Sequence, residues 1–127
     1  MSRRTTAVFL VCLLAAGCMG GNEKVNIVDA SVTRSGAGTY YYRGSVDGEN
    51  AGTVTYKMCV ADLRTGGKEG VSLGTVEKSR TVNPGDRFTI NLDERYRDIA
   101  TQVVLCCYQT EAYSGTPTCS QPHNITV

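Results

Sequence analysis

The sequence predicts an all-β domain, folded as a two-sheet sandwich of about seven strands. From Val25 onward the residues alternate between apolar and polar, and no window keeps the 3.6-residue period for the length of a helix. Turn residues recur at intervals of about ten residues, which is the spacing typical of sandwiches. The sequence from residue 18 to the C-terminus is long enough for one domain but not for two.

The first two predicted strands each place apolar side chains on a single face. The residues expected to face the core are Val28, Ala30, Val32, Tyr40, Tyr42 and Val46. The residues expected on the opposite face of the second strand are Arg43, Ser45 and Asp47. Tyr41 should point outward beside Arg43, because successive side chains of a strand lie on opposite faces.

The third predicted strand has the cleanest alternation in the chain. Its expected core face consists of Val54, Tyr56, Met58 and Val60. Its expected solvent face consists of Thr53, Thr55, Lys57 and Cys59. Residues 62–70 are rich in turn residues and predict a hairpin connection, with glycines available for positive φ.

The second half of the chain continues the same pattern. Residues 83–86, Asn-Pro-Gly-Asp, predict a tight turn, and Phe88, Ile90 and Leu92 should then alternate inward. Residues 93–98 are charged and predict a crossover with one helical turn. Residues 101–108 are apolar on both faces, which indicates a central strand. Residues 114–117 predict a loop, and a last strand should carry Ile125 and Val127.

The N-terminus has the three parts of a secretory signal peptide. Arg3 and Arg4 precede an apolar run, which ends in small residues. The run is about ten residues long, whereas spanning a bilayer takes roughly twenty. Cys18 directly follows Ala-Ala-Gly, which resembles the lipobox of prokaryotic lipoproteins. The resemblance implies that Cys18 is diacylated and becomes the new N-terminus, although Ala15 stands where the lipobox has leucine. An ordinary signal peptide with a chance cysteine is the alternative.

This division predicts a signal peptide over 1–17, a lipidated cysteine and tether over 18–24, and a sandwich domain over 25–127. The sequence has 13 basic and 12 acidic residues, and removing Arg3 and Arg4 leaves 11 against 12, a net charge of -1. Nucleic-acid binding needs a clustered basic face, so this balance excludes a nucleic-acid partner. We expect an exported protein, held at the cell surface or in the periplasm by its lipid.

The cysteines of the domain agree with export. An even number in a small exported domain predicts two disulfides. Zinc is the competing interpretation, but paired C-x-x-C spacings are missing and two of the cysteines are adjacent. The four residues are Cys59, Cys106, Cys107 and Cys119.

The alternation of side chains also suggests how the cysteines pair. If Val103, Leu105 and Cys107 face the core, Cys106 points outward like Cys59 and can meet it across adjacent strands. Cys107 is then left for Cys119. The opposite face assignment exchanges Cys106 and Cys107, so both pairings stay open.

Two strings carry a resemblance to a known class of domain. VTYKMCVADLRTGG (54–67) and VNPGDRFTI (82–90) resemble the FxLYD and CARDB types of immunoglobulin-like domain in exported prokaryotic proteins. The shared rhythm is a strand ending in an Asp and Gly turn, a Pro-Gly-Asp turn, and a returning strand with Phe. The resemblance implies an immunoglobulin-like sandwich, although the literal Phe-x-Leu-Tyr-Asp string does not occur.

The sequence offers little catalytic chemistry, and we predict no enzyme activity, no catalytic residue, no cofactor and no metal. His123 is the only histidine, so a blue-copper set of two histidines and a cysteine cannot be filled, and we expect His123 in an exposed loop. No nucleophile has a base at a recognisable spacing. The acidic pairs Asp47 with Glu49 and Asp93 with Glu94 are expected in turns or loops, where carboxylates are solvated.

Two features could serve binding or modification. Tyr41 and Arg43 are the candidate ligand contacts, because exposed tyrosines suit protein or carbohydrate partners. The alternative is that tyrosine simply favours strands. Asn124 begins an Asn-Ile-Thr sequon and is a glycosylation candidate in a host that modifies such sites.

We therefore expect a lipid-anchored, non-catalytic binding, adhesion or structural module of the cell envelope, with an envelope protein or carbohydrate as partner. The alternative from another class is a small metal-handling or redox lipoprotein that uses Cys106, Cys107 and Cys119. A hydrolase is a third class, but it would need a cleft of perturbed residues that the sequence does not suggest.

Overall fold

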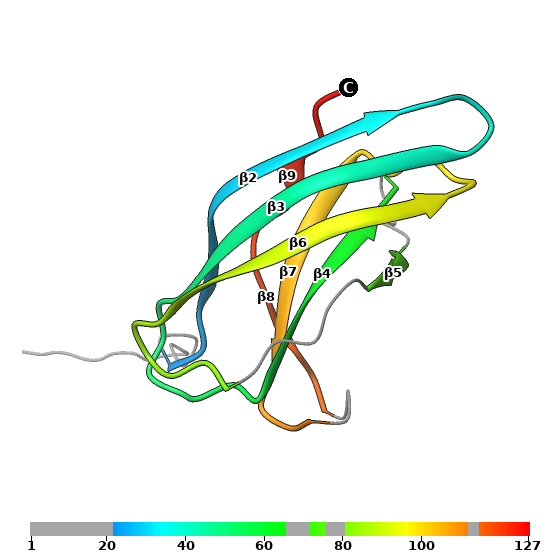
Figure 1. The fold of residues 1–127 in the computed structure, drawn as a ribbon. Coiled ribbons are helices and arrows are strands. Elements are labelled where there is room, and N and C mark those ends of the chain that lie inside the picture. The colour runs from blue at the N-terminus through cyan, green and yellow to red at the C-terminus, as the bar shows by residue number, and fades with distance from the viewer. Residues whose placement is uncertain (1–21, 66–71, 76–80, 112–114) are drawn as a thin grey trace, which may run out of the picture.

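Two antiparallel sheets face each other in the computed structural model, which describes residues 22–65, 72–75, 81–111 and 115–127 (Figure 1). The first sheet has the order β2-β3-β6, with β2 at Val25–Ser35, β3 at Tyr40–Asn50 and β6 at Arg87–Tyr96. The second has the order β5-β4-β7-β8, and β9 also pairs with β7. Its strands are β4 (Met58–Arg64), β5 (Ser72–Thr75), β7 (Gln102–Tyr108), β8 (Thr118–Cys119) and β9 (His123–Asn124). The predicted all-β sandwich is confirmed.

The last two strands are halves of one interrupted strand. Cys119 pairs with Cys106 and His123 with Val103, so four steps along the later strand match three along β7. Ser120 fills the interruption, because its hydroxyl accepts the Leu105 N–H at 3.0 Å and donates to the Gln121 carbonyl at 3.0 Å. When β8 and β9 are taken together, the described strands number seven, as the sequence predicts.

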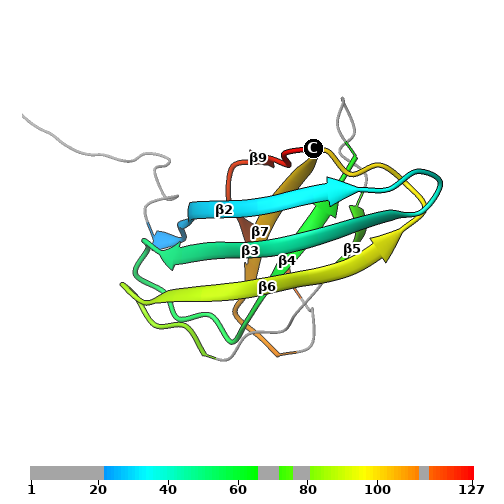
Figure 2. The same ribbon diagram turned by 45° about the horizontal axis from the view of Figure 1, so that its top comes forward.

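The chain crosses between the sheets in the manner of an immunoglobulin-like sandwich. It builds β2 and β3 in the first sheet, β4 and β5 in the second, returns for β6, and ends with β7 to β9 in the second. Figure 2 shows β2, β3 and β6 side by side, with β4 and β7 behind them. In this view none of the described segments lies over the outer side of the three-stranded sheet.

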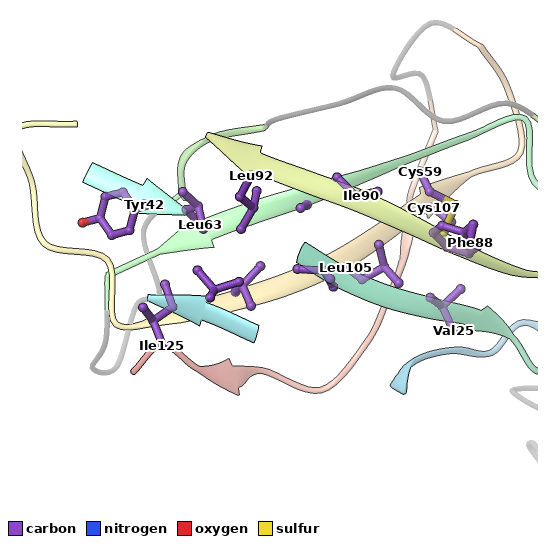
Figure 3. Packing of buried hydrophobic residues seen from close by; sticks show 14 of the residues in the cluster. Val25, Tyr42, Cys59, Leu63, Phe88, Ile90, Leu92, Leu105, Cys107 and Ile125 are labelled. Atoms are coloured by element: carbon purple, nitrogen blue, oxygen red, sulfur yellow. A yellow bond between two sulfur atoms is a disulfide. The ribbon is translucent and has the colours of Figure 1, made fainter. Parts of the chain in front are cut away.

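The core lies between the sheets, where the alternating residues meet (Figure 3). The predicted inward positions Tyr42, Val46, Phe88, Ile90 and Leu92 are all buried there. Their partners from the second sheet include Cys59, Ala61, Leu63, Val103, Leu105 and Cys107. The prediction that residues 101–108 form a central strand is also confirmed, since β7 lies between β4 and the β8–β9 pair and is buried on both faces.

One glycine lets the two sheets approach closely. A Cβ built on Gly48 would lie 2.3 Å from Leu105 Cδ2 and 2.8 Å from Phe88 Cζ, which is closer than nonbonded carbons tolerate. Gly48 thus makes room for the two larger side chains in the centre of the sandwich.

The prediction for the third strand is wrong in its second half. Tyr56 is buried in the main core and forms an isolated bridge with Val82, but the chain bends at Lys57 and β4 begins only at Met58. The bend shifts the alternation by one residue, so Cys59 faces the main core. Met58 and Val60 instead form a second buried cluster on the other face of β4. An uninterrupted period of two cannot reveal such a shift.

The same shift decides the disulfides. Two bridges are present, as predicted, but they join Cys59 to Cys107 and Cys106 to Cys119. Of the two pairings that the sequence left open, the one that joins Cys59 to Cys106 is wrong and the exchanged one is correct. Each bridge joins residues that lie directly opposite each other on neighbouring strands. The adjacent cysteines of β7 therefore bind it to β4 through the core face and to β8 through the outer face.

Three smaller expectations also fail for local reasons. A β-bulge between Ile27 and Asp29 turns Val28 outward, where it is 45% exposed. Residues 93–96 continue β6 and form no helical turn, because they remain paired with residues 40–43 of β3. The C-terminal strand ends at Asn124, and although Ile125 is buried, Val127 is exposed.

Asn50 is fully buried where β3 ends, a role that no sequence motif indicates. Its side-chain amide donates to the carbonyls of Val54 at 2.8 Å and Val82 at 3.2 Å, and its oxygen accepts the Gly52 N–H at 3.1 Å. The backbone carbonyl of Asn50 accepts the N–H of Gly85, which has a φ of 87° in the predicted turn at 83–86. Asn50 therefore ties the β3–β4 connection to this turn.

In the part of the chain that the structure describes, no helix has the length and apolar character needed to cross a membrane. Cys18 and the predicted signal peptide lie outside the described residues, so their assignment stays a prediction.

Candidate functional site

The outer side of the three-stranded sheet is the candidate binding surface, and we call it the polar face. Its residues project from β2, β3 and β6 because they alternate with the buried core residues of the same strands. The residues that define the polar face are Asp29, Ser31, Thr33, Ser35, Tyr41, Arg43, Ser45, Asp47, Thr89, Asn91, Asp93 and Arg95.

Tyr41 lies among charged side chains at one end of the polar face. It stands opposite Arg95 on β6, and its neighbour Arg43 stands opposite Asp93. The guanidinium carbons of Arg43 and Arg95 lie 5.7 Å and 4.9 Å from the centre of the Tyr41 ring, within the range of cation–π attraction. The Tyr41 hydroxyl donates a hydrogen bond to Asp93 Oδ1. We call these four residues the tyrosine–arginine cluster.

The sequence predicted Tyr41 and Arg43 on the outward face, and the structure confirms that placement. It did not predict Asp93 and Arg95 as their partners, because residues 93–98 were interpreted as a crossover. The missed signal is the alternation of Arg87, Thr89 and Asn91 with buried residues, which continues without interruption into Asp93 and Arg95.

The chemistry of the tyrosine–arginine cluster favours anions. Two exposed guanidinium groups are held beside one ring, and the cluster contains a single carboxylate, which already accepts the Tyr41 hydroxyl. Guanidinium groups bind carboxylates and phosphates through paired hydrogen bonds. Because the two arginines already contact the Tyr41 ring, stacking of a sugar on that ring is a weaker interpretation of this site.

The two acidic pairs were expected in turns or loops, but both lie on strands. Asp47 and Glu49 belong to β3, while Asp93 and Glu94 belong to β6. Asp47 Oδ1 accepts the Thr89 hydroxyl at 2.7 Å, and Glu49 Oε2 lies 4.0 Å from Arg87 Nε. Consecutive residues such as Asp93 and Glu94 project to opposite faces of a strand, so that pair does not converge on one site.

His123 is exposed, as predicted, but it lies on β9 and not in a loop. It lines an open groove of about 410 Å³ at the edge of the sandwich, between the bulged start of β2 and the β8–β9 interruption. The same groove is lined by Asn26, Ile27, Val28, Glu49, Gln121 and Pro122.

Asn124 and the cysteines complete the predicted sites. Asn124 is exposed, and Gln102 donates to its side-chain oxygen at 3.5 Å, so the sequon is at the surface and its glycosylation stays a prediction. The four cysteines of the predicted domain are in disulfides, and metal binding by Cys106, Cys107 or Cys119 would first require their reduction. Within the described ranges, no group of three histidine, cysteine or acidic residues could hold a metal ion.

Alkaline pH should destabilise the domain through its tyrosines. Burial raises the pKa of Tyr56 and Tyr96, and the hydrogen bond to Asp93 is the main cause of the raised pKa of Tyr41. The tyrosine hydroxyls therefore lose their protons at lower pH in the unfolded chain than in the native state. Their contribution to the free energy of unfolding is complete below pH about 10 and is lost as the pH rises above that value. Urea unfolding between pH 8 and 11 measures this. If the urea concentration at half-unfolding stays constant as the pH rises above 10, the prediction is contradicted.

Comparison with known proteins does not assign this chain to a family. No protein-family model, no curated protein and no solved structure matches the chain. The resemblance to FxLYD and CARDB domains therefore stays a prediction.

Proposed function

We propose that this protein is an exported, lipid-anchored binding module of the cell envelope that holds a partner on its polar face. The observation that supports this best is the tyrosine–arginine cluster, in which two exposed guanidinium groups lie near one ring, whose hydroxyl donates to the Asp93 carboxylate. Two disulfides in a small domain are compatible with an oxidising compartment outside the cytosol.

The partner that fits this surface is an envelope polymer or protein that presents carboxylate groups. Arg43 and Arg95 lie diagonally across the adjacent strands β3 and β6, each near the Tyr41 ring, so both can contact one extended acidic ligand. Ser45 and Asn91, the next pair along the same face, add neutral donors and acceptors. A polar, hydrogen-bonding sheet surface of this kind suits recognition of an extended partner more than enclosure of a small molecule.

The anchor is tested by Cys18→Ser. One diacylglycerol supplies two acyl chains, each methylene of which contributes about 0.8 kcal/mol when buried, so the wild-type protein should remain in the membrane fraction. The variant should move to the soluble fraction and lose the mass of the lipid. A mature wild-type N-terminus at another residue, without lipid, would overturn the lipid anchor but not the binding function.

The surface is tested by charge reversal. Isolated envelopes from host cells lacking the protein are mixed with the soluble Cys18→Ser protein and sedimented. Arg95→Glu should weaken saturable binding about tenfold or more, since a hydrogen bond to a charged group contributes roughly 1.5–3 kcal/mol. Added salt should weaken binding as well, because the cluster is exposed.

Lys57→Glu is the matched control, because Lys57 is an exposed cation outside the polar face. It should bind envelopes like the parent protein. Equal loss of binding in the Lys57 and Arg95 variants would indicate a general charge effect, and unchanged binding of the Arg95 variant would exclude the cluster.

A further inference from the structure

The two disulfides have different environments. Cys59 and Cys107 are fully buried in the main core, and Figure 3 shows their bond beside Phe88. Cys106 is also buried, but on the opposite face of β7, in the second cluster. Its partner Cys119 is exposed. Because Cys119 is exposed and lies outside the main core, we expect an external reagent to approach the second bridge from this residue.

The position of Cys119 in the sheet supports this approach. β8 contains only Thr118 and Cys119, and the regular pairing with β7 is interrupted immediately after it. After the interruption, two hydrogen bonds join Ser120 to Leu105. The Ser120 N–H donates to the Leu105 carbonyl at 2.7 Å, and the Ser120 hydroxyl accepts from the Leu105 N–H at 3.0 Å. Short edge segments with few backbone hydrogen bonds open locally at low cost in free energy.

A cation lies at the other sulfur of the bridge. Arg64 Nη2 is 3.9 Å from Cys106 Sγ. Asp62 fixes the same guanidinium, because its Oδ2 accepts from Arg64 Nε at 3.0 Å and lies 2.9 Å from Nη2. A neighbouring cation stabilises a thiolate and so makes that sulfur the better leaving group in thiol–disulfide exchange.

From these observations we propose that Cys106–Cys119 is a thiol–disulfide exchange site, with Cys119 as the sulfur that is attacked and Cys106 as the leaving thiolate. An external thiolate attacks Cys119 Sγ and forms a new S–S bond with it. The bond between Cys119 and Cys106 breaks, and its electron pair remains on Cys106 Sγ beside Arg64. A second external thiolate then attacks the external sulfur of the mixed disulfide, which releases Cys119 as a thiolate and an oxidised pair of the external thiol.

This inference goes beyond the proposed binding function and does not depend on it. It gives a redox role to one bridge, whereas the Cys59–Cys107 bridge remains structural. The Arg64 guanidinium is a positioning group here, since it acts on the leaving sulfur and not on the attacking thiol.

The test treats the purified mature protein, without the predicted signal peptide and with the Cys18→Ser substitution, under native conditions with graded dithiothreitol or reduced glutathione, followed by iodoacetamide. Because Cys106 and Cys107 are adjacent, fragment ions that separate them are needed to place each label. We expect Cys106 and Cys119 to be labelled at reductant concentrations roughly tenfold below those that label Cys59 and Cys107, because exposed disulfides are the more easily reduced. The first glutathione adduct should be on Cys119, with the free thiol on Cys106.

Variants test the role of the cation. Arg64→Gln should slow the first step roughly threefold to tenfold, and Arg64→Lys should restore most of the rate. Lys57→Gln is the control, because none of the described contacts joins Lys57 to Cys106 Sγ. This variant should react at the wild-type rate. Circular dichroism before and after treatment checks that the fold persists.

Three results would overturn the proposal. The first is parallel labelling of all four cysteines, which would mean that reduction follows global unfolding. The second is a glutathione adduct on Cys106 in place of Cys119. The third is an Arg64→Gln variant that folds normally and reacts at the wild-type rate.

Discussion

Replacing both Cys59 and Cys107 with alanine should lower the free energy of unfolding by about 4 kcal/mol, the largest effect we expect from any pair of substitutions. The bridge joins residues 48 positions apart, and the loss of loop entropy in the unfolded chain grows with that separation. Removing two sulfurs from the packed core adds a cavity cost. For a domain of this size the melting temperature should fall by about 15 °C or more, which differential scanning calorimetry measures.

The matched control is the double variant Cys106→Ala with Cys119→Ala. Its bridge spans 13 positions, so the same entropy argument gives about 3 kcal/mol, and the cavity cost should be smaller because only Cys106 is buried while Cys119 is exposed. The order of the two effects is the critical result. An equal or greater loss in the control pair would contradict the assignment of Cys59–Cys107 as the main structural bridge.

Single substitutions test the pairing itself. In Cys107→Ala, Cys59 should become the free thiol, whereas in Cys106→Ala the free thiol should be Cys119. Thiol labelling followed by peptide mapping distinguishes these outcomes, since Cys59 and Cys119 are far apart in the sequence. The exchanged result would instead support the pairing of Cys59 with Cys106 and of Cys107 with Cys119.

The second large effect is expected at Asn50. Asn50→Ala should cost about 2–4 kcal/mol of unfolding free energy, because it leaves the Val54 carbonyl and the Gly52 N–H without their partner in a buried site. The Val82 carbonyl still accepts a hydrogen bond from the Tyr56 N–H at 3.0 Å in the variant, so it should contribute little to the loss of unfolding free energy. Urea unfolding measures the difference, with the exposed Asn91→Ala as control.

Asn50→Asp separates hydrogen bonding from packing, because the two side chains have nearly the same shape. An aspartate would place a charged oxygen against the carbonyls that the amide now donates to, so its folded-state pKa should be raised. Its cost should therefore exceed that of alanine at pH 7 and decrease as the pH falls toward about 4, the ordinary pKa of aspartate, because the carboxyl of the folded protein protonates above that pH. A cost that does not change with pH would show that the Asn50 amide does not make these contacts.

Some features of this protein follow from local sequence alone. The apolar run in β7 predicts a strand buried on both faces, because no register can place either side in water. The Asn-Pro-Gly-Asp turn at 83–86 is fixed by the backbone restrictions of proline and glycine, and Gly85 has the expected positive φ. The alternation at Phe88, Ile90 and Leu92 likewise determines which face of β6 is buried.

Other features depend on contacts between segments that are distant in sequence. The bend at Lys57 turns Cys59 from the solvent face to the core face, and the bulge near Val28 turns Val28 from the core to the surface. Neither irregularity changes the apolar and polar pattern, so a period of two cannot locate them. Pairing with β3 likewise keeps Asp93 and Arg95 in β6, where charge and turn propensity alone suggest a crossover.

The sequence by itself determined the sandwich class, the central strand, the number of disulfides and the outward position of Tyr41 and Arg43, because each depends on the properties of a short segment. Only the tertiary structure decided which cysteines pair, what surrounds Tyr41, and that Arg64 lies beside one sulfur. Those depend on strand register, and a shift of one residue exchanges the two faces of a strand. Register is set by packing across the sandwich, which no local pattern encodes.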